Sequence, residues 1–239
     1  MTTGPDYSRG SSLPMRLLIE DGLLPDPCPE LSPATVLNLG RGNAAGSQRP
    51  TATVTIVTQP QDLGAAAGSL GYYVPGTHCR QGDILSAVAA SARPVWIERG
   101  SFLSPMDLAH ITERFGSKQD VTIVESGSSF GYDDRVLDLR ALALYEAWGL
   151  RVALGVGDLC LGDGASSGFR PSWAIDQASR ARFAKTFLRV AEHWGCDLVL
   201  KSPVLLKGAA TDVAIAAACS QLAAQICEHL VARKQKNHD

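Results

Sequence analysis

The stretch VTIVESGSSFGYDD, residues Val121–Asp134, is the part of the sequence that decides the fold. Its first four residues are apolar or β-branched, as in a short strand that is buried on both faces. Glu125, Ser126 and Ser129 follow, and Gly127 allows the backbone to turn at little steric cost. Because ligands of parallel α/β proteins bind at the carboxyl ends of the strands, we expect these polar residues at a functional site.

Short strand-like runs alternate with helical segments along the rest of the chain. We expect strands at residues 15–19, 35–39, 53–58, 72–74, 95–97, 121–125, 151–156 and 197–200. Apolar residues at helical spacing predict helices at 62–69, 81–91, 105–115, 136–148, 177–194 and 211–233. Ser104 is a good N-cap for the third helix, with Pro105 at its first position. Eight strands alternating with helices predict an α/β fold of the (β/α)8 or TIM-barrel type.

The first units of this barrel are expected to be shortened. Residues 23–34, LLPDPCPELSPA, contain four prolines, which exclude a normal crossover helix. The sequence leaves open whether the barrel is closed or distorted. Residues 157–168 are glycine-rich and predict a loop. We expect residues 1–14 to be a flexible N-terminus and residues 15–239 to form a single TIM-barrel domain.

Composition and charge exclude several classes of function. The formal net charge is −2, so no global basic field favours nucleic acid or an anionic membrane. No apolar run approaches the roughly 18 residues of a membrane span, and residues 1–12 lack the pattern of an export signal. The six cysteines lack the C-x-x-C spacing of a zinc site. We expect a cytoplasmic protein with reduced thiols, no cofactor, no nucleic-acid partner and no membrane contact.

Three motifs carry a family resemblance. SFGYDDRVLDL (129–139) is similar to NFGYDNLVVDM, VPGTHCRQGDILSAVA (74–89) to LPAFLARQTDLVEAMA, and FLSPMDLAHITERF (102–115) to FVSPGQMGNIVDKF. By these motifs, residues 72–161 resemble the second half of the barrel of the 3-deoxy-octulosonate-8-phosphate (KDO8P) synthases, a family that includes the heptulosonate-phosphate (DAHP) synthases. The resemblance implies a TIM barrel and an aldolase that condenses phosphoenolpyruvate with an aldose phosphate in biosynthesis.

Many ligand-binding residues of that family are replaced here. The family binds phosphoenolpyruvate through lysines and arginines, since a carboxylate and a phosphate together need several charge-assisted donors. The resemblance aligns its KASFDKANR with NLGRGNAAG (38–46), so its lysines become Asn38 and Asn43, and Arg41 is the cation nearby. Its two-arginine GGRR aligns with SGFR, in which Arg170 remains.

The replacements continue at the middle strands. VKKPQF aligns with IERGSF (97–102), so two lysines become Glu98 and Arg99. The arginine of DRG becomes Ser126, and the histidine of FDVTHALQ becomes Asp158. The mouth loses positive charge, and we expect it to suit a neutral, hydroxylated or cationic ligand better than a doubly charged anion.

The last strand loses the residues that bind metal in the family. FIEAHPDP aligns with LVLKSPVL (198–205), so its glutamate becomes Leu200 and its aspartate Val204. Neither side chain coordinates a cation, so the resemblance implies no metal site here. Lys201 is either a desolvated lysine able to form a Schiff base or a rim lysine exposed to solvent.

Two interpretations stay open for the other candidates. Arg99 either binds an anionic group together with Arg41, or pairs with Glu98 or Glu125 and holds the mouth together. Glu125 is accordingly a base or the partner of an arginine. Asp158 is either a general acid or base, or the cap of a turn.

These substitutions predict a KDO8P synthase-like barrel that has lost phosphoenolpyruvate condensation and is a pseudoenzyme or acts on another substrate. The catalytic candidates are Glu125, Asp158 and Lys201, and the ligand-binding candidates are Asn38, Arg41, Glu98, Arg99, Ser126, Ser129 and Arg170. The alternative is an active condensing transferase that uses arginines 41, 99 and 170. A third hypothesis is structural, with assembly as a homo-oligomer or with another barrel protein through helix 211–233. We expect a small, sugar-like molecule as the ligand of the mouth.

Overall fold

A computed structural model of the chain describes residues 15–20, 23, 36–40, 53–66, 68–130, 134–161, 177–201 and 213–236. Within these ranges, eight parallel strands form a closed barrel in the order β1-β10-β9-β6-β5-β4-β3-β2. The TIM barrel predicted from the sequence is confirmed, and the alternative of an open barrel is wrong. The predicted proline-rich connection, the N-terminus, Arg41 and Arg170 lie outside the described residues.

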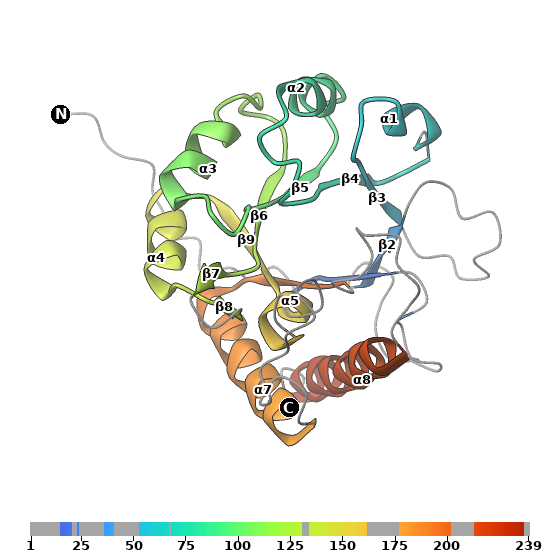
Figure 1. Cartoon of the computed structure of the whole chain (residues 1–239), viewed down its shortest axis with the longest axis vertical. Helices are drawn as coiled ribbons and strands as arrows, with labels where there is room; N and C mark the ends of the chain where they lie inside the picture. The colour runs from blue at the N-terminus through green and yellow to red at the C-terminus, as the bar shows by residue number, and fades with distance from the viewer. Residues whose placement is uncertain are drawn as a thin grey trace.

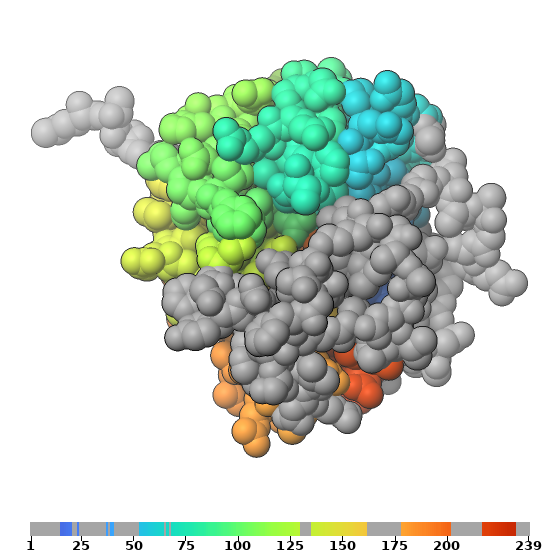
Figure 2. All heavy atoms as spheres, viewed as in Figure 1, coloured from blue at the N-terminus to red at the C-terminus, as the bar shows by residue number. Residues whose placement is uncertain are grey.

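The barrel strands are short and the helices lie around them (Figure 1). The strands are β1 (Leu17–Glu20), β2 (Val36–Gly40), β3 (Thr53–Ile56), β4 (Gly71–Val74), β5 (Val95–Glu98), β6 (Val121–Glu125), β9 (Arg151–Gly155) and β10 (Asp197–Leu200). The helices are α1 (Asp62–Ala65), α2 (Gly82–Ala90), α3 (Pro105–Thr112), α4 (Leu139–Ala147), α5 (Val156–Leu161), α7 (Gln177–Trp194) and α8 (Val213–Lys236). Seen from the same side as spheres, α1, α2 and α3 form one continuous flank of this face (Figure 2).

Strand residues alternate between two apolar cores, as the period of two in a strand requires. Trp96 of β5 faces the barrel interior with Tyr73 of β4, while Val95 and Ile97 pack against the helices outside. Both faces of the strands are therefore buried, which explains why β6 begins with the apolar or β-branched residues Val121–Val124 before the polar Glu125 at its end.

The segment after β6 differs from the prediction. Residues 128–130 (β7) and 134–136 (β8) form an antiparallel hairpin, where the sequence predicted a loop and then the start of a helix at residue 136. Helix α4 instead begins at Leu139, because the Asp138 side chain accepts a hydrogen bond from the backbone N–H of Arg140. The predicted loop at 157–168 is also partly wrong, since α5 occupies its first residues.

Other local predictions are confirmed. Ser104 caps α3 in a capping box with Asp107, and Pro105 lies at the first helical position. The apolar residues of α8, among them Cys219, Leu222 and Ile226, are buried in the core that joins helices and barrel. That face of α8 therefore packs within the chain, and assembly with another subunit through this helix stays a prediction.

The described cysteines, Cys79, Cys160, Cys196, Cys219 and Cys227, are buried and form no disulfide. Burial raises the pKa of the Cys160 thiol to about 12, which keeps it from acting as a thiolate. In the parts of the chain that the structure describes, no helix has both the length and the apolar composition to cross a bilayer.

At the amino end of the barrel, the Asp197 carboxylate links the starts of three strands, β1, β9 and β10. Asp197, at the start of β10, accepts hydrogen bonds from the backbone N–H (2.9 Å) and the guanidinium (2.8 and 3.0 Å) of Arg16. Arg151, at the start of β9, lies 3.3 Å from the same carboxylate. The Arg16 guanidinium also stacks over the Trp96 ring, 5.3 Å from its centre.

Candidate functional site

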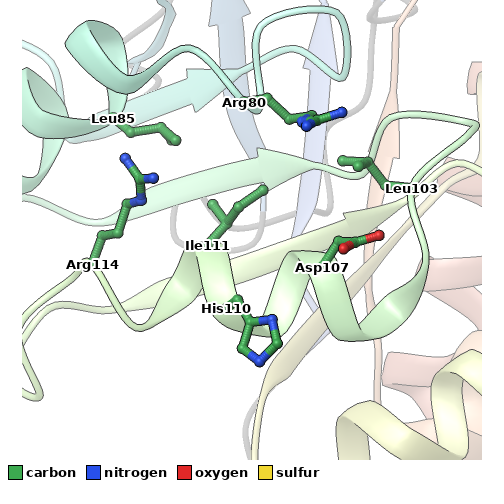
Figure 3. A pocket seen from close by; sticks show the side chains of 7 residues that line it. All are labelled: Arg80, Leu85, Leu103, Asp107, His110, Ile111 and Arg114. Carbon is green, nitrogen blue, oxygen red and sulfur yellow. The ribbon is translucent and has the colours of Figure 1, made fainter.

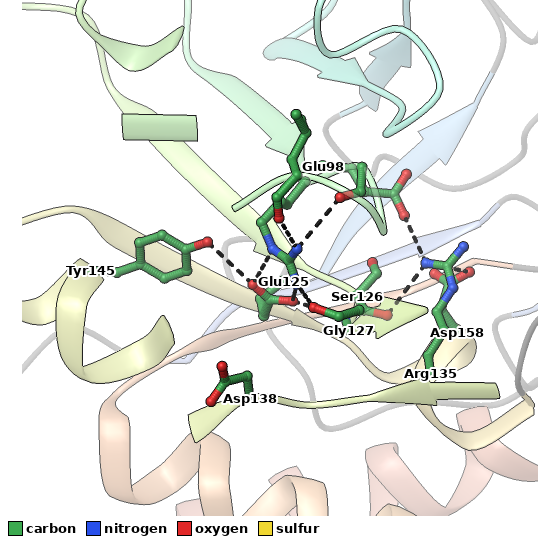
Figure 4. Close-up of polar contacts among 12 residues, drawn as sticks. Glu98, Glu125, Ser126, Gly127, Arg135, Asp138, Tyr145 and Asp158 are labelled. Atoms are coloured by element: carbon green, nitrogen blue, oxygen red, sulfur yellow. Dashed lines mark hydrogen bonds and ion pairs between the residues drawn. The ribbon is translucent and has the colours of Figure 1, made fainter. Parts of the chain in front are cut away.

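The carboxyl ends of the strands bring the five charged site candidates of the described residues together. Their side chains lie at or directly after the ends of β5, β6, β9 and β10, and each residue is at most 3% exposed. They are Glu98, Arg99, Glu125, Asp158 and Lys201. We call this set, with Arg135 and Ser126, the mouth cluster, and Figure 4 shows Glu98, Arg135 and Asp158 converging at one side of it. Buried charges at this density need partners, and each has one.

Arg99 forms a bidentate ion pair with Glu125. Its Nε donates to Oε2 at 2.7 Å and its Nη2 donates to Oε1 at 2.6 Å. The remaining N–H groups donate to the Ser128 hydroxyl at 2.9 Å and to the Leu103 carbonyl at 2.5 Å. Burial lowers the pKa of Arg99, but Glu125 outweighs that and raises it. The alternative in which Arg99 pairs with Glu125 is therefore the one the structure contains.

Both carboxylate oxygens of Glu125 accept two hydrogen bonds each. Besides Arg99, it accepts from the backbone N–H of Gly127 at 2.9 Å and from the Tyr145 hydroxyl at 3.3 Å. Burial and the Glu125 charge raise the pKa of Tyr145, so this tyrosine stays a proton donor to the carboxylate. A carboxylate with four donors around it is held as an acceptor, and its geometry favours the structural alternative over a free base.

Lys201 joins the two carboxylates of a second group. Its Nζ lies 2.8 Å from Asp158 Oδ2 and 3.2 Å from Glu98 Oε1. Burial lowers the pKa of Lys201, but Asp158 and Glu98 together raise it above its ordinary value. The alternative of a solvent-exposed rim lysine is wrong, since Lys201 is 3% exposed. Its raised pKa is also the opposite of what a Schiff-base lysine requires.

Glu98 is held in its ionised form. Burial raises its pKa, yet Lys201, the backbone N–H of Gly76 at 2.8 Å and Arg135 outweigh burial and lower it. Asp158 lies in the first turn of α5, which replaces the glycine loop expected around it. A side chain at Gly157 would collide with the Lys201 carbonyl, so this glycine allows α5 to begin against β10.

Arg135 of β8 is a member of the mouth cluster that the sequence analysis missed. Its Nη1 donates to the Ser126 carbonyl at 3.3 Å and lies 3.8 Å from Asp158 and 4.0 Å from Glu98 (Figure 4). The sequence did contain a sign of it, because Arg135 in SFGYDDRVLDL replaces a leucine of the similar family motif NFGYDNLVVDM. The described cluster thus holds three cations and three carboxylates, so its charges balance.

Two buried hydroxyls beside Glu98 lack a well-formed hydrogen bond. Within the described residues, neither Tyr73 Oη nor Ser126 Oγ has a partner in good hydrogen-bond geometry, although both lie close enough to the Glu98 carboxylate to interact with it. Burial and then the charges of Glu98 and Asp158 raise the pKa of Tyr73 well above its ordinary value, so its hydroxyl stays protonated. Ser126 packs so closely on Gly155 that a side chain there would collide with it. Both hydroxyls can donate to a polar molecule.

The remaining predicted residues are less informative. Ser129 is exposed on β7, and its backbone N–H donates to the Ser101 carbonyl at 3.1 Å. Asn38 lies in β2, but its side chain is outside the described part of the structure. Arg41 and Arg170 lie outside it entirely, so a clamp that uses them with Arg99 stays a prediction.

Comparison with known proteins places the resemblance on part of the chain. The chain is 36% identical over 102 residues to the 2-dehydro-3-deoxyphosphooctonate aldolase of Acidithiobacillus ferrooxidans, which is 41% of this chain and 36% of that protein. It is 40% identical over 82 residues to that of Aromatoleum aromaticum (33% and 29%), and 33% identical over 116 residues to that of Pelobacter propionicus (46% and 42%). Over this part, the chain is a homologue of the KDO8P synthases. The resemblance predicted from the motifs is confirmed.

The match spans less than half the length of these KDO8P synthases, and no family model matches the chain. The charges of this KDO8P synthase-like barrel also differ from the family motifs in a correlated way. Where the motifs have lysine and histidine, the chain has Glu98 and Asp158, and where they have leucine and alanine, it has Arg135 and Lys201. These four residues are the ones that contact one another.

Proposed function

We propose that this KDO8P synthase-like barrel does not condense phosphoenolpyruvate. The observation that carries the proposal is the pairing of Arg99 with Glu125, which uses the N–H groups that a phosphate or carboxylate would need. The other described cations of the mouth cluster, Lys201 and Arg135, lie against Glu98 and Asp158. No described cation of the cluster is left over for an anionic substrate.

The energy balance argues against rearrangement. A charge-assisted hydrogen bond to a desolvated anion contributes about 1.5–3 kcal/mol. To offer its guanidinium to a substrate, Arg99 would leave Glu125 as a buried, uncompensated carboxylate, which costs about 3–5 kcal/mol. Binding of phosphoenolpyruvate would therefore be weakened by orders of magnitude relative to a site whose cations are free.

The ligand that we propose instead is small, neutral and hydroxylated. A polyol or sugar can accept from the Tyr73 and Ser126 hydroxyls and can bridge carboxylates and cations without unbalancing the charge. For any turnover of such a ligand, Lys201 would act as a fixed positive charge and not as a proton donor, because its raised pKa keeps it protonated. The protein is then a pseudoenzyme or an enzyme with an altered substrate.

Phosphate release tests the proposal. The protein is incubated with phosphoenolpyruvate and an aldose phosphate, alongside the aldolase of Acidithiobacillus ferrooxidans as the positive control. We expect no release above background from this chain. Release by the wild type that is lost in Arg99→Ala and kept in Arg182→Ala, an exposed arginine of α7, would support the alternative of an active condensing enzyme.

A further inference from the structure

A pocket lies outside the barrel, between α2 and α3, away from the mouth cluster (Figure 3). Its volume is about 290 Å³, near the lower end of the roughly 300–1,000 Å³ typical of ligand pockets. Arg80, from the loop before α2, and Arg114, just after α3, lie at its two ends. The size restricts an occupant to a small molecule.

The polar lining of this pocket is mainly cationic. Within the described residues, neither the Arg80 nor the Arg114 guanidinium forms a hydrogen bond or an ion pair, and His110 adds a third nitrogen-bearing side chain. The acidic member, Asp107, is engaged in the cap of α3, where it accepts from the Ser104 hydroxyl at 2.8 Å and from its backbone N–H at 3.2 Å. Two guanidinium groups therefore remain to bind an anion.

The floor of the pocket is apolar. Leu85 of α2 and Ile111 of α3 are buried, and Leu103 is half-buried. A floor of this kind favours hydrocarbon over water, whereas inorganic phosphate would leave it uncovered. A ligand that fits this pocket therefore needs a negatively charged group for the cationic ends and an apolar portion for the floor.

We propose that this pocket binds a small organic anion, with a phosphate or carboxylate group held at one end by Arg80 or Arg114 and a few-carbon apolar portion on Leu85, Leu103 and Ile111. The site is separate from the mouth and does not depend on what the mouth binds. It does contact the mouth indirectly, because the Leu103 carbonyl accepts a hydrogen bond from Arg99.

Titration with phenyl phosphate tests this site. Backbone amide shifts should change in residues 80–85 and 103–114, and phenyl phosphate should bind at least about tenfold more tightly than either inorganic phosphate or phenol. The double variant Arg80→Ala/Arg114→Ala should weaken binding at least about tenfold, since it removes the guanidinium group at each end of the pocket. The control Arg182→Ala, an exposed arginine on α7, should bind as the wild type does.

Three results would overturn the proposal. They are unchanged affinity in the double variant, equal affinity for phenol and phenyl phosphate, and shift changes confined to the mouth cluster. Both arginines are exposed and unpaired among the described residues, so the variant should fold, and Arg114→Glu provides a second test by charge reversal. Phosphoenolpyruvate that shifts the mouth residues would contradict the proposed function and leave this site intact.

Discussion

The two ends of the barrel use charge differently. At the amino end, Arg16 and Arg151 share Asp197, and their side chains are 17% and 30% exposed. At the carboxyl end, the side chains of Lys201, Glu98 and Asp158 are at most 4% exposed. Water reaches the two arginines of the amino end, although Asp197 itself is 4% exposed. At the carboxyl end, where barrels bind their ligands, the most exposed side chain of the mouth cluster is that of Arg135, at 16%.

The charges at the carboxyl end are costly in free energy, because they are buried. A buried ion pair gives little net stability compared with apolar residues, because desolvation offsets its attraction. Keeping Arg99, Glu125 and the Lys201 group at the mouth is therefore hard to explain by stability alone. It fits a site in which cations that the family motifs lack, Arg135 and Lys201, lie beside carboxylates that those motifs also lack, Glu98 and Asp158.

The largest expected effect comes from breaking the pair at the end of β6. Glu125→Ala should lower the free energy of unfolding by about 3–5 kcal/mol, since Arg99 is left buried without its partner. Urea denaturation measures this change. The double variant Arg99→Met/Glu125→Leu should recover most of the loss, and a double variant as unstable as Glu125→Ala would contradict the argument.

Removal of the lysine should cost somewhat less. Lys201→Met leaves Glu98 and Asp158 facing each other, but Arg135 remains within 4.0 Å of both. We expect a loss of about 2–4 kcal/mol in the free energy of unfolding, measured in the same way. A loss below about 0.5 kcal/mol would mean that the lysine is not the centre of this group.

The amino end should be more tolerant. Asp197→Asn removes the charge that Arg16 and Arg151 share, but both arginines can turn toward water. The expected loss is about 1–2 kcal/mol in the free energy of unfolding. If this variant were as unstable as Glu125→Ala, the contrast between the two ends would not hold.

The smallest expected effect is the pH dependence of the stability that Glu98 contributes, which appears only at acidic pH. The pKa of Glu98 is lowered from 4.5 in the folded state, so its contribution is present above 4.5 and is lost as the pH falls through the folded value. The pKa of Lys201 is raised, so its contribution is complete below 10.5 and is not lost at neutral pH. The stability difference between wild type and Glu98→Gln should be flat from pH 6 to 8 and shrink below about pH 4.5. A decrease already at neutral pH would contradict the assigned direction.

Much of the fold follows from local patterns, and the site does not. The alternation of short apolar runs with amphipathic segments predicted all eight strands, and the bounds of α7 and β10 are as expected. The β7–β8 hairpin was missed because three-residue polar strands leave no periodicity to detect. The buried state of Lys201 was missed because its partners come from β5 and from α5, far away in sequence. Pairing across strand ends is a property of the closed barrel.

Calorimetric titration with phosphoenolpyruvate shows whether the mouth cations are free to bind an anion. It is done with the Arg80→Ala/Arg114→Ala variant, so that the outer pocket does not contribute. If the mouth cations are already paired with carboxylates, no binding should be seen up to about 1 mM ligand. Saturable binding below that concentration, abolished by Arg99→Ala, would show that Arg99 leaves Glu125 for the substrate and would contradict the account.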